Sequence, residues 1–145
     1  MSQTIDFSQL VAGIGDAVVV SDTQGAIIYW NAAATRMFGF SQTEALGQSL
    51  DIFTPERLRA RHWEGYHRSM ASGTTKYGSD LLKVPAMHKD GHSMSIAFTV
   101  AMLRDASGTV NAIVAVIRDE TERFNSERTL KKRILELESA QSVKN

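Results

Sequence analysis

A histidine lies in the middle of a row of otherwise apolar or aromatic residues within residues 54–73. This row takes every fourth position and consists of Leu58, His62, Tyr66 and Met70. Residues four apart lie on one face of a helix, so the row predicts an apolar helix face that carries one imidazole. A histidine in such a place is either hydrogen-bonded within the core or used as a ligand, and neutral imidazole is a common metal ligand. The residue pattern leaves both roles open.

Both ends of this helix are marked in the sequence. Thr54 is suited to cap the N-terminus, Pro55 to occupy the first helical position, and Glu56 to complement the helix dipole. Gly73 is suited to the left-handed residue that follows a helix. We therefore expect one helix between Thr54 and Gly73.

Two further histidines, His88 and His92, flank a predicted tight turn at residues 89–91. They can nearly face each other across this turn. A metal site there needs a carboxylate or a third imidazole, and Asp90 alone is a poor supplement. We therefore expect an exposed hairpin rather than a metal site.

The remaining candidate side chains have less specific patterns. Trp30 and Trp63 can stack on a flavin or another aromatic ligand, although large aromatic residues serve mostly as core or lid. His67 follows His62 by five positions, so we expect it to face solvent. The sequence has no phosphate-binding glycine loop, nucleophile elbow, paired catalytic carboxylates or kinase signature. An enzyme is therefore the least supported class of function.

Length and composition narrow the possible classes of fold and function further. The chain has 145 residues and 43% hydrophobic residues, which suits a single globular domain with a real core. Lysine plus arginine and aspartate plus glutamate number 16 each, and this balance gives no indication of a nucleic-acid partner. The absence of cysteine excludes disulfides, thiolate chemistry and a cysteinyl-flavin photosensor. No segment is apolar enough for a signal peptide or a membrane span, so we expect a cytoplasmic protein without membrane contact.

Alternating and β-rich runs predict strands at 17–22, 26–30, 80–88, 93–104 and 109–119. The first two runs flank a turn at Gly25, and Pro85 marks the third as an edge strand or a bulge. Short helices are expected at residues 5–12, 31–39 and 41–47, with capping residues Asp6, Asn31 and Ser41. Two strands, a run of helices and three strands predict an antiparallel five-stranded sheet with short helices on one face, in the α+β class.

From Glu120 the composition becomes charged and helix-favouring. Apolar and polar positions at 4-3-4 spacing indicate about two heptads of a coiled coil, formed by Leu130, Ile134, Leu137 and Gln141. Such a helix either leaves the domain to pair with a second chain or packs back on its own sheet, and both remain open. We expect an N-terminal helical cap at 1–15, a central domain at 16–119 and a signalling or dimerisation helix at 120–145.

Three motifs in the same order resemble the PAS sensor family. They are WNAAATRMFGFSQTEALGQSL, HKDG with the strand that follows it, and VIRDETER, within residues 7–123. The residues Asp119-Glu120-Thr121 resemble the junction of that family to a signalling helix. The resemblance implies the PAS fold, in which a five-stranded sheet and short helices hold a small molecule or pair with partners.

Residues 55–91 resemble, without a gap, the helix, loop and strand of the haem-binding PAS domains of the FixL type. This resemblance implies haem b with His62 as the proximal iron ligand. Arg68 matches a basic residue that contacts a haem propionate, and Lys76 matches a second such position. The cofactor-binding set would also include Tyr66 and Met70 from the histidine row.

The distal side implied by the same resemblance is apolar. The distal wall of the family corresponds to Tyr77, Phe98 and Val100, and its distal arginine corresponds to Leu82. An apolar distal side favours carbon monoxide, nitric oxide or a redox response over selective oxygen binding. Tyr77 and Lys83 are the candidates for a replacement donor.

The leading hypothesis is a sensory or regulatory domain of a signal-transduction protein. It would be a homodimer through its N- and C-terminal helices, and it would bind haem b, with FAD or no cofactor as alternatives. Binding would move the sheet and act through the C-terminal helix on a kinase, cyclase or other effector in the same chain or another. The alternative is a cofactor-free or metabolite-binding PAS module that serves association only.

Overall fold

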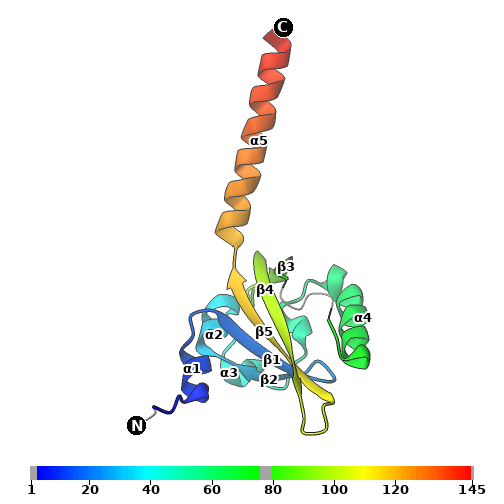
Figure 1. Ribbon diagram of the computed structural model, residues 1–145. Helices are drawn as coiled ribbons and strands as arrows, with labels where there is room; N and C mark the ends of the chain where they lie inside the picture. The colour runs from blue at the N-terminus through cyan, green and yellow to red at the C-terminus, as the bar shows by residue number, and fades with distance from the viewer. Residues whose placement is uncertain (1–2, 76–79, 145) are drawn as a thin grey trace.

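The computed structural model of the protein describes residues 3–75 and 80–144. They form one antiparallel sheet with the strand order β2-β1-β5-β4-β3, and the helices between β2 and β3 pack against one face (Figure 1). The strands are β1 (Ala17–Asp22), β2 (Ile27–Trp30), β3 (Leu82–Met87), β4 (Ser93–Arg104) and β5 (Val110–Asp119). The helices are α1 (Phe7–Gly13), α2 (Ala32–Phe38), α3 (Gln42–Ala45), the 3-10 helix η1 (Leu50–Phe53), α4 (Glu56–Ser72) and α5 (Thr121–Lys144). The predicted fold class and element order are confirmed.

The register of the sheet follows from the alternation of side chains along its long strands. β4 pairs with β5 over nearly its whole length, and β3 is the edge strand on the other side of β4. Pro85 lies in this edge strand, where its missing N–H costs no central ladder bond. The face of the sheet toward the helices carries the core side chains, including Ala17, Val19, Ile96 and Ile117.

The core beside β2 is aromatic. Trp30 and Phe38 are almost fully buried, and the rings of Phe38 and Phe53 stack at a centroid distance of 4.7 Å. The indole N–H of Trp30 donates to the Thr35 hydroxyl at 3.1 Å and to the Phe40 carbonyl at 3.2 Å. Trp30 is therefore a core residue with a satisfied polar atom.

Local capping signals account for most helix starts. Asp6 caps α1, Asn31 caps α2, and Ser41 with Glu44 forms the capping box of α3, as predicted. The prediction that Thr54 caps α4 is wrong. Its hydroxyl donates instead to the Leu50 carbonyl of η1 at 2.9 Å, and α4 begins at Glu56 without a side-chain cap.

The two terminal helices differ from the others because their apolar side chains are exposed. Figure 1 shows α5 projecting away from the sheet, so the alternative that it packs back on its own sheet is wrong. Leu130, Ile134 and Leu137 are 62%, 54% and 57% exposed. In α1, Phe7 and Leu10 are also exposed. None of the described helices has the length and apolarity that a bilayer span requires.

Candidate functional site on helix α4

The histidine row of α4 faces the sheet. Tyr66 is buried, and Leu58, His62 and Met70 are partly buried, while the neighbours His67 and Arg68 are exposed. The helix ends at Gly73, whose φ of 71° is in the left-handed region that favours glycine. The predicted helix face and the predicted exposure of His67 are therefore confirmed.

The imidazole of His62 is the polar group of this face whose hydrogen bonding is incomplete. Its Nδ1 atom is buried and finds no hydrogen-bond partner among the residues that the structure describes. The ring lies edge-on to Trp63 at a centroid distance of 4.8 Å and is 5.9 Å from the ring of Tyr66. Burial lowers the pKa of His62; the charge of Asp51 opposes this shift and that of His67 adds to it. The ring is therefore neutral at pH 7, with a lone pair available to a ligand.

Tyr66 connects α4 to the sheet through its hydroxyl group. The hydroxyl lies 2.9 Å from Ser21 Oγ and donates a hydrogen bond to the Asp22 carbonyl at the end of β1. Burial raises the pKa of Tyr66. Sequence reasoning missed these partners, although a polar Ser21 on the inward face of an apolar strand was a usable signal.

Trp63 covers the turn between β1 and β2. Its indole N–H donates to Asp51 Oδ1 at 2.8 Å. A Cβ atom added to Gly25 would lie 2.1 Å from the Trp63 ring, so the indole occupies the space that only glycine leaves. Since the φ of Gly25 is also 81°, this glycine meets both a backbone and a packing requirement. Trp63 thus acts as a lid over the turn.

The strands opposite α4 supply an apolar surface. Leu82 pairs with Phe98 across β3 and β4, so these two side chains share one face of the sheet. Phe98, Val100 and Met70 are partly buried and pack against the core. Lys83 points to the other face and is exposed, because side chains alternate along a strand. It therefore does not share a face with Leu82, which weighs against its role as a replacement donor.

The expected basic partners of a cofactor are less well placed. Arg68 is exposed and pairs with Glu64 of the same helix at 3.0 Å. Lys76 and Tyr77 lie outside the described residues. The roles predicted for these three residues stay predictions.

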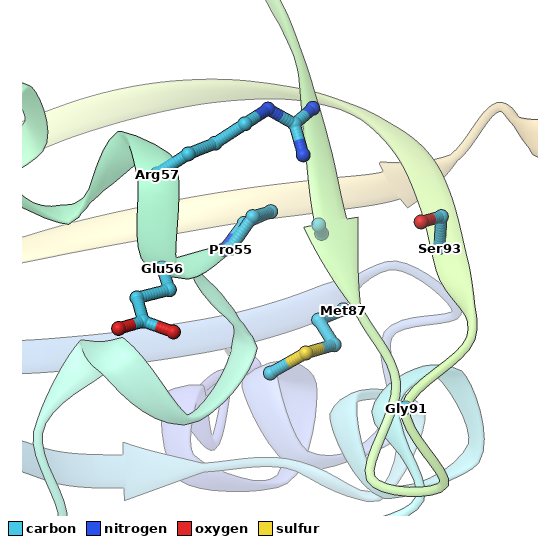
Figure 2. A pocket seen from close by; sticks show the side chains of 7 residues that line it. Pro55, Glu56, Arg57, Met87, Gly91 and Ser93 are labelled. Carbon is cyan, nitrogen blue, oxygen red and sulfur yellow. The ribbon is translucent and has the colours of Figure 1, made fainter.

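His62 lines neither of two pockets found at the surface of the described residues. The first, of about 550 Å³, lies between the start of α4 and the hairpin of β3 and β4. Figure 2 shows Pro55, Glu56 and Arg57 on its helix side and Met87 and Ser93 on its strand side. The second, of about 390 Å³, lies beside α2. Among the described residues, the rings of Trp63 and Tyr66 lie against the His62 ring, and neither of these two pockets reaches it.

A polar cluster fixes the start of α5 to the sheet. The Thr121 hydroxyl lies 2.5 Å from Asp119 Oδ1 and accepts from the Ser95 N–H at 3.0 Å. The Glu120 N–H donates to the Ser95 carbonyl at 2.8 Å. The exit helix is therefore attached to β4 as well as to β5, from which it continues.

Comparison with known families identifies this arrangement. The PAS fold family matches residues 5–119. The chain belongs to the PAS fold family. Among solved structures, the PAS domain of a Colwellia psychrerythraea protein superposes with a TM-score of 0.70 at 22% identity, covering 80% of this chain and 95% of that one. An RNA-binding light-oxygen-voltage receptor superposes with a TM-score of 0.71 at 20% identity, covering 88% of this chain and 36% of that one. Both likenesses show the fold.

Curated relatives of this PAS domain are larger proteins. An uncharacterized protein of Azorhizobium caulinodans is 31% identical over 118 residues, which cover 81% of this chain and 16% of the relative. Sensor protein FixL of Bradyrhizobium diazoefficiens is 29% identical, covering 81% and 23%. Oxygen sensor protein DosP of Escherichia coli is 24% identical, covering 79% and 14%. The chain thus spans less than a quarter of each, and it is a PAS sensory domain of the kind found in signalling proteins.

Proposed function

We propose that this PAS domain binds haem b through His62 and reports the state of that cofactor through α5. The observation that carries the proposal is the buried Nδ1 atom of His62, which lacks a partner among the described residues. A buried polar atom without a partner costs free energy, so it calls for an explanation. An imidazole that is neutral at pH 7 is suited to bind iron. The similarity to sensor protein FixL and oxygen sensor protein DosP supports the same proposal.

The residues around His62 suit a flat apolar group. Met70 supplies apolar surface from α4, and Leu82, Phe98 and Val100 supply it from the sheet. Arg68, at the rim, and Lys76, beyond the described residues, would pair with the propionates. Bound haem would supply an iron centre for a diatomic gas or for electron transfer. Since Leu82 presents no donor, the site favours carbon monoxide, nitric oxide or a redox response.

Cofactor binding in this site requires α4 to move away from the sheet. Trp63 and Tyr66 pack around His62, and the Tyr66 hydroxyl holds α4 to Ser21 and Asp22. Release of this hydroxyl contact is the step by which the helix would open. Because β1 pairs with β5, movement at Asp22 would be transmitted across the sheet to Asp119 and Thr121. The exit helix would then change its direction and act on a kinase, cyclase or other effector.

Haemin titration of the purified chain tests the proposal. We expect a Soret band at one haem per chain, which disappears in His62→Ala and remains in His67→Ala, the exposed histidine of the same helix. In His62→Gly, added imidazole should restore the band if the cavity left by the side chain admits a free ligand. A colourless wild-type chain, or equal bands in the two alanine variants, would overturn the proposal. A flavin spectrum in the purified protein would instead support FAD.

A second candidate function is association without a cofactor, and the exposed terminal helices favour it. Apolar side chains of α5 at heptad spacing and of α1 have no cover within the described part of the chain. Coiled-coil pairing of α5 in a homodimer would bury Leu130, Ile134 and Leu137. Light scattering of the wild type and of Ile134→Asp tests it: a dimer should become a monomer, while Glu136→Lys on the same helix should leave the dimer intact. A monomeric wild type would exclude this function.

A further inference from the structure

The turn between β3 and β4 gathers three potential metal ligands. His88, Asp90 and His92 each offer a ligand atom, and these three atoms lie within 4.8 Å of one another. Asp90 Oδ1 is 3.3 Å from His88 Nδ1 and 2.5 Å from His92 Nδ1. The two imidazole rings are nearly parallel, with an interplanar angle of 17° and a centroid distance of 4.5 Å. Two imidazoles and one carboxylate therefore converge on one side of this turn.

The backbone of the turn sets this arrangement. The His88 N–H donates to the His92 carbonyl at 3.0 Å, and the Gly91 N–H donates to the His88 carbonyl at 2.9 Å. Gly91 has a φ of 94°, which a side chain would disfavour. The carboxylate of Asp90 also accepts from the His92 N–H at 3.0 Å, which holds its Oδ1 close to the Nδ1 atoms of both rings. The ligand positions are thus fixed by a closed turn rather than by long flexible side chains.

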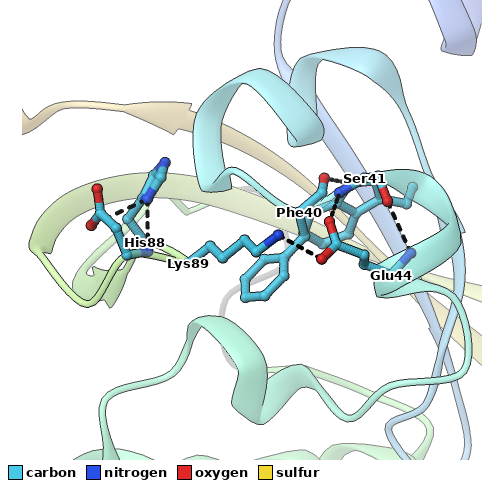
Figure 3. A network of polar contacts seen from close by, with 7 residues as sticks. Phe40, Ser41, Glu44, His88 and Lys89 are labelled. Carbon is cyan, nitrogen blue, oxygen red and sulfur yellow. Dashed lines mark hydrogen bonds and ion pairs between the residues drawn. The ribbon is translucent and has the colours of Figure 1, made fainter.

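Contacts with α2 and α3 hold the same turn from outside. The His88 ring rests on Gly39, where an added Cβ atom would lie 2.5 Å from the ring. The Lys89 N–H donates to the Phe38 carbonyl at 2.9 Å. Figure 3 shows the Lys89 side chain extending from the turn to Glu44, and its Nζ is 2.6 Å from Glu44 Oε2. The cation of Lys89 is therefore paired with Glu44 and does not neutralise Asp90.

We propose that His88, Asp90 and His92 form a binding site for a divalent transition-metal ion, with Zn²⁺ as the ion used to test it. Two imidazole nitrogens and one carboxylate oxygen are ligands that zinc prefers, and water would complete the coordination. Magnesium prefers an all-oxygen octahedral set, so these ligands discriminate against it. The site is separate from His62 and does not depend on the proposed haem.

Isothermal titration calorimetry of the 145-residue chain without haem tests the site. We expect one Zn²⁺ per chain and no heat of binding with Mg²⁺. His92→Ala and Asp90→Asn should each weaken zinc binding by about tenfold or more, because each removes a ligand. His67→Ala and His62→Ala should leave zinc binding unchanged, which also separates this result from the haem experiment. Circular dichroism confirms that each variant is folded.

Nuclear magnetic resonance of the imidazole nitrogens gives a second measurement that needs no variant. Zinc should shift the ring nitrogens of His88 and His92 and leave those of His62 and His67 in place. Failure of the wild type to take up zinc, equal binding by His92→Ala, or shifts confined to His62 or His67 would overturn the proposal.

Discussion

The two histidine environments of this PAS domain differ in how their polar atoms are satisfied. His62 lies among aromatic rings, and its buried Nδ1 has no partner in the described part of the chain. His88 and His92 lie at a surface turn, where Asp90 and the backbone contact their Nδ1 atoms. A buried imidazole without a partner is destabilising and is retained at a cost, whereas the surface pair contributes to the turn itself. His62 is therefore suited to bind a ligand that becomes the partner of its imidazole. The turn is suited to bind a metal ion between side chains that already lie close together.

The largest effect on stability is expected at Gly25, because this glycine leaves room for the ring of Trp63, the neighbour of His62 in α4. Gly25→Ala should lower the free energy of unfolding by about 2–4 kcal/mol, because alanine is strained at positive φ and its Cβ would displace Trp63. Gly47→Ala is the matched control, since Gly47 has a φ of 84° and no heavy atom within 4 Å of an added Cβ. It should lose about 1–2 kcal/mol. Equal losses in urea denaturation would show that the lid contact is unimportant.

The next effect concerns the hydroxyl that ties α4 to β1. Tyr66→Phe should cost about 1–2 kcal/mol of unfolding free energy, because it leaves Ser21 and the Asp22 carbonyl without this partner. The same variant should bind haemin more tightly, because α4 can then open at a lower cost in free energy. Tyr29→Phe, also on the sheet, serves as the control for a lost hydroxyl, since no hydroxyl partner of Tyr29 is seen among the described residues. Weaker haemin binding by Tyr66→Phe would contradict this opening step.

The pH dependence of stability sharpens the contrast between the two histidine environments. The pKa of His62 is lowered in the folded state, so the unfolded chain binds more protons in the region below pH 6.5. Its contribution to stability is present above the unfolded pKa and is lost as the pH falls below it. When the pH is lowered from about 7.5 to about 5.5, the free energy of unfolding of His62→Phe should therefore fall less than that of the wild type. These two values lie about one unit on either side of the usual histidine pKa. Equal losses by His62→Phe and the wild type in urea titrations at these two pH values would contradict this prediction.

The smallest effect is expected at the contact that anchors the turn. The side-chain hydrogen bond from Lys89, with the backbone N–H of Ser41, lowers the pKa of Glu44 from 4.5 to about 2. Lys89→Met should raise this pKa toward 4.5 but not fully, since the Ser41 contacts remain. A carboxyl titration by nuclear magnetic resonance measures it, and Lys83→Met, an exposed lysine of β3, is the control. An unchanged Glu44 pKa in Lys89→Met would show that the turn is not anchored at Glu44.

Much of the fold could be predicted because its signals are local. Caps at Asn31 and Ser41, the glycine at the first hairpin and the alternation in β4 each act over a few residues of the chain. The prediction failed where two local options competed. Thr54 can cap the helix after it or bond back to the helix before it, and the structure takes the second option.

For the candidate site, the sequence predicted only which residues share one face of the helix. The four-residue spacing determined that His62 lies in the same row as Tyr66, because helix geometry is fixed by the backbone. Whether the imidazole has a partner depends on residues far away in the chain, and spacing contains no information about them. The turn shows the same limit. Asp90 is a poor supplement by type, but the folded turn brings its Oδ1 close to the Nδ1 atoms of His88 and His92.

The sequence by itself determined the element order and the residues of the α4 row, because periodicity and capping act through neighbours in the chain. The PAS fold was implied by the resemblance of three motifs to that family. The tertiary structure alone decided that Tyr66 reaches Ser21, that Trp63 covers Gly25 and that α5 projects from the sheet. The physical reason is that burial and hydrogen bonding are settled between segments about 40 or more residues apart, whose contacts arise only when the sheet and the helices pack together.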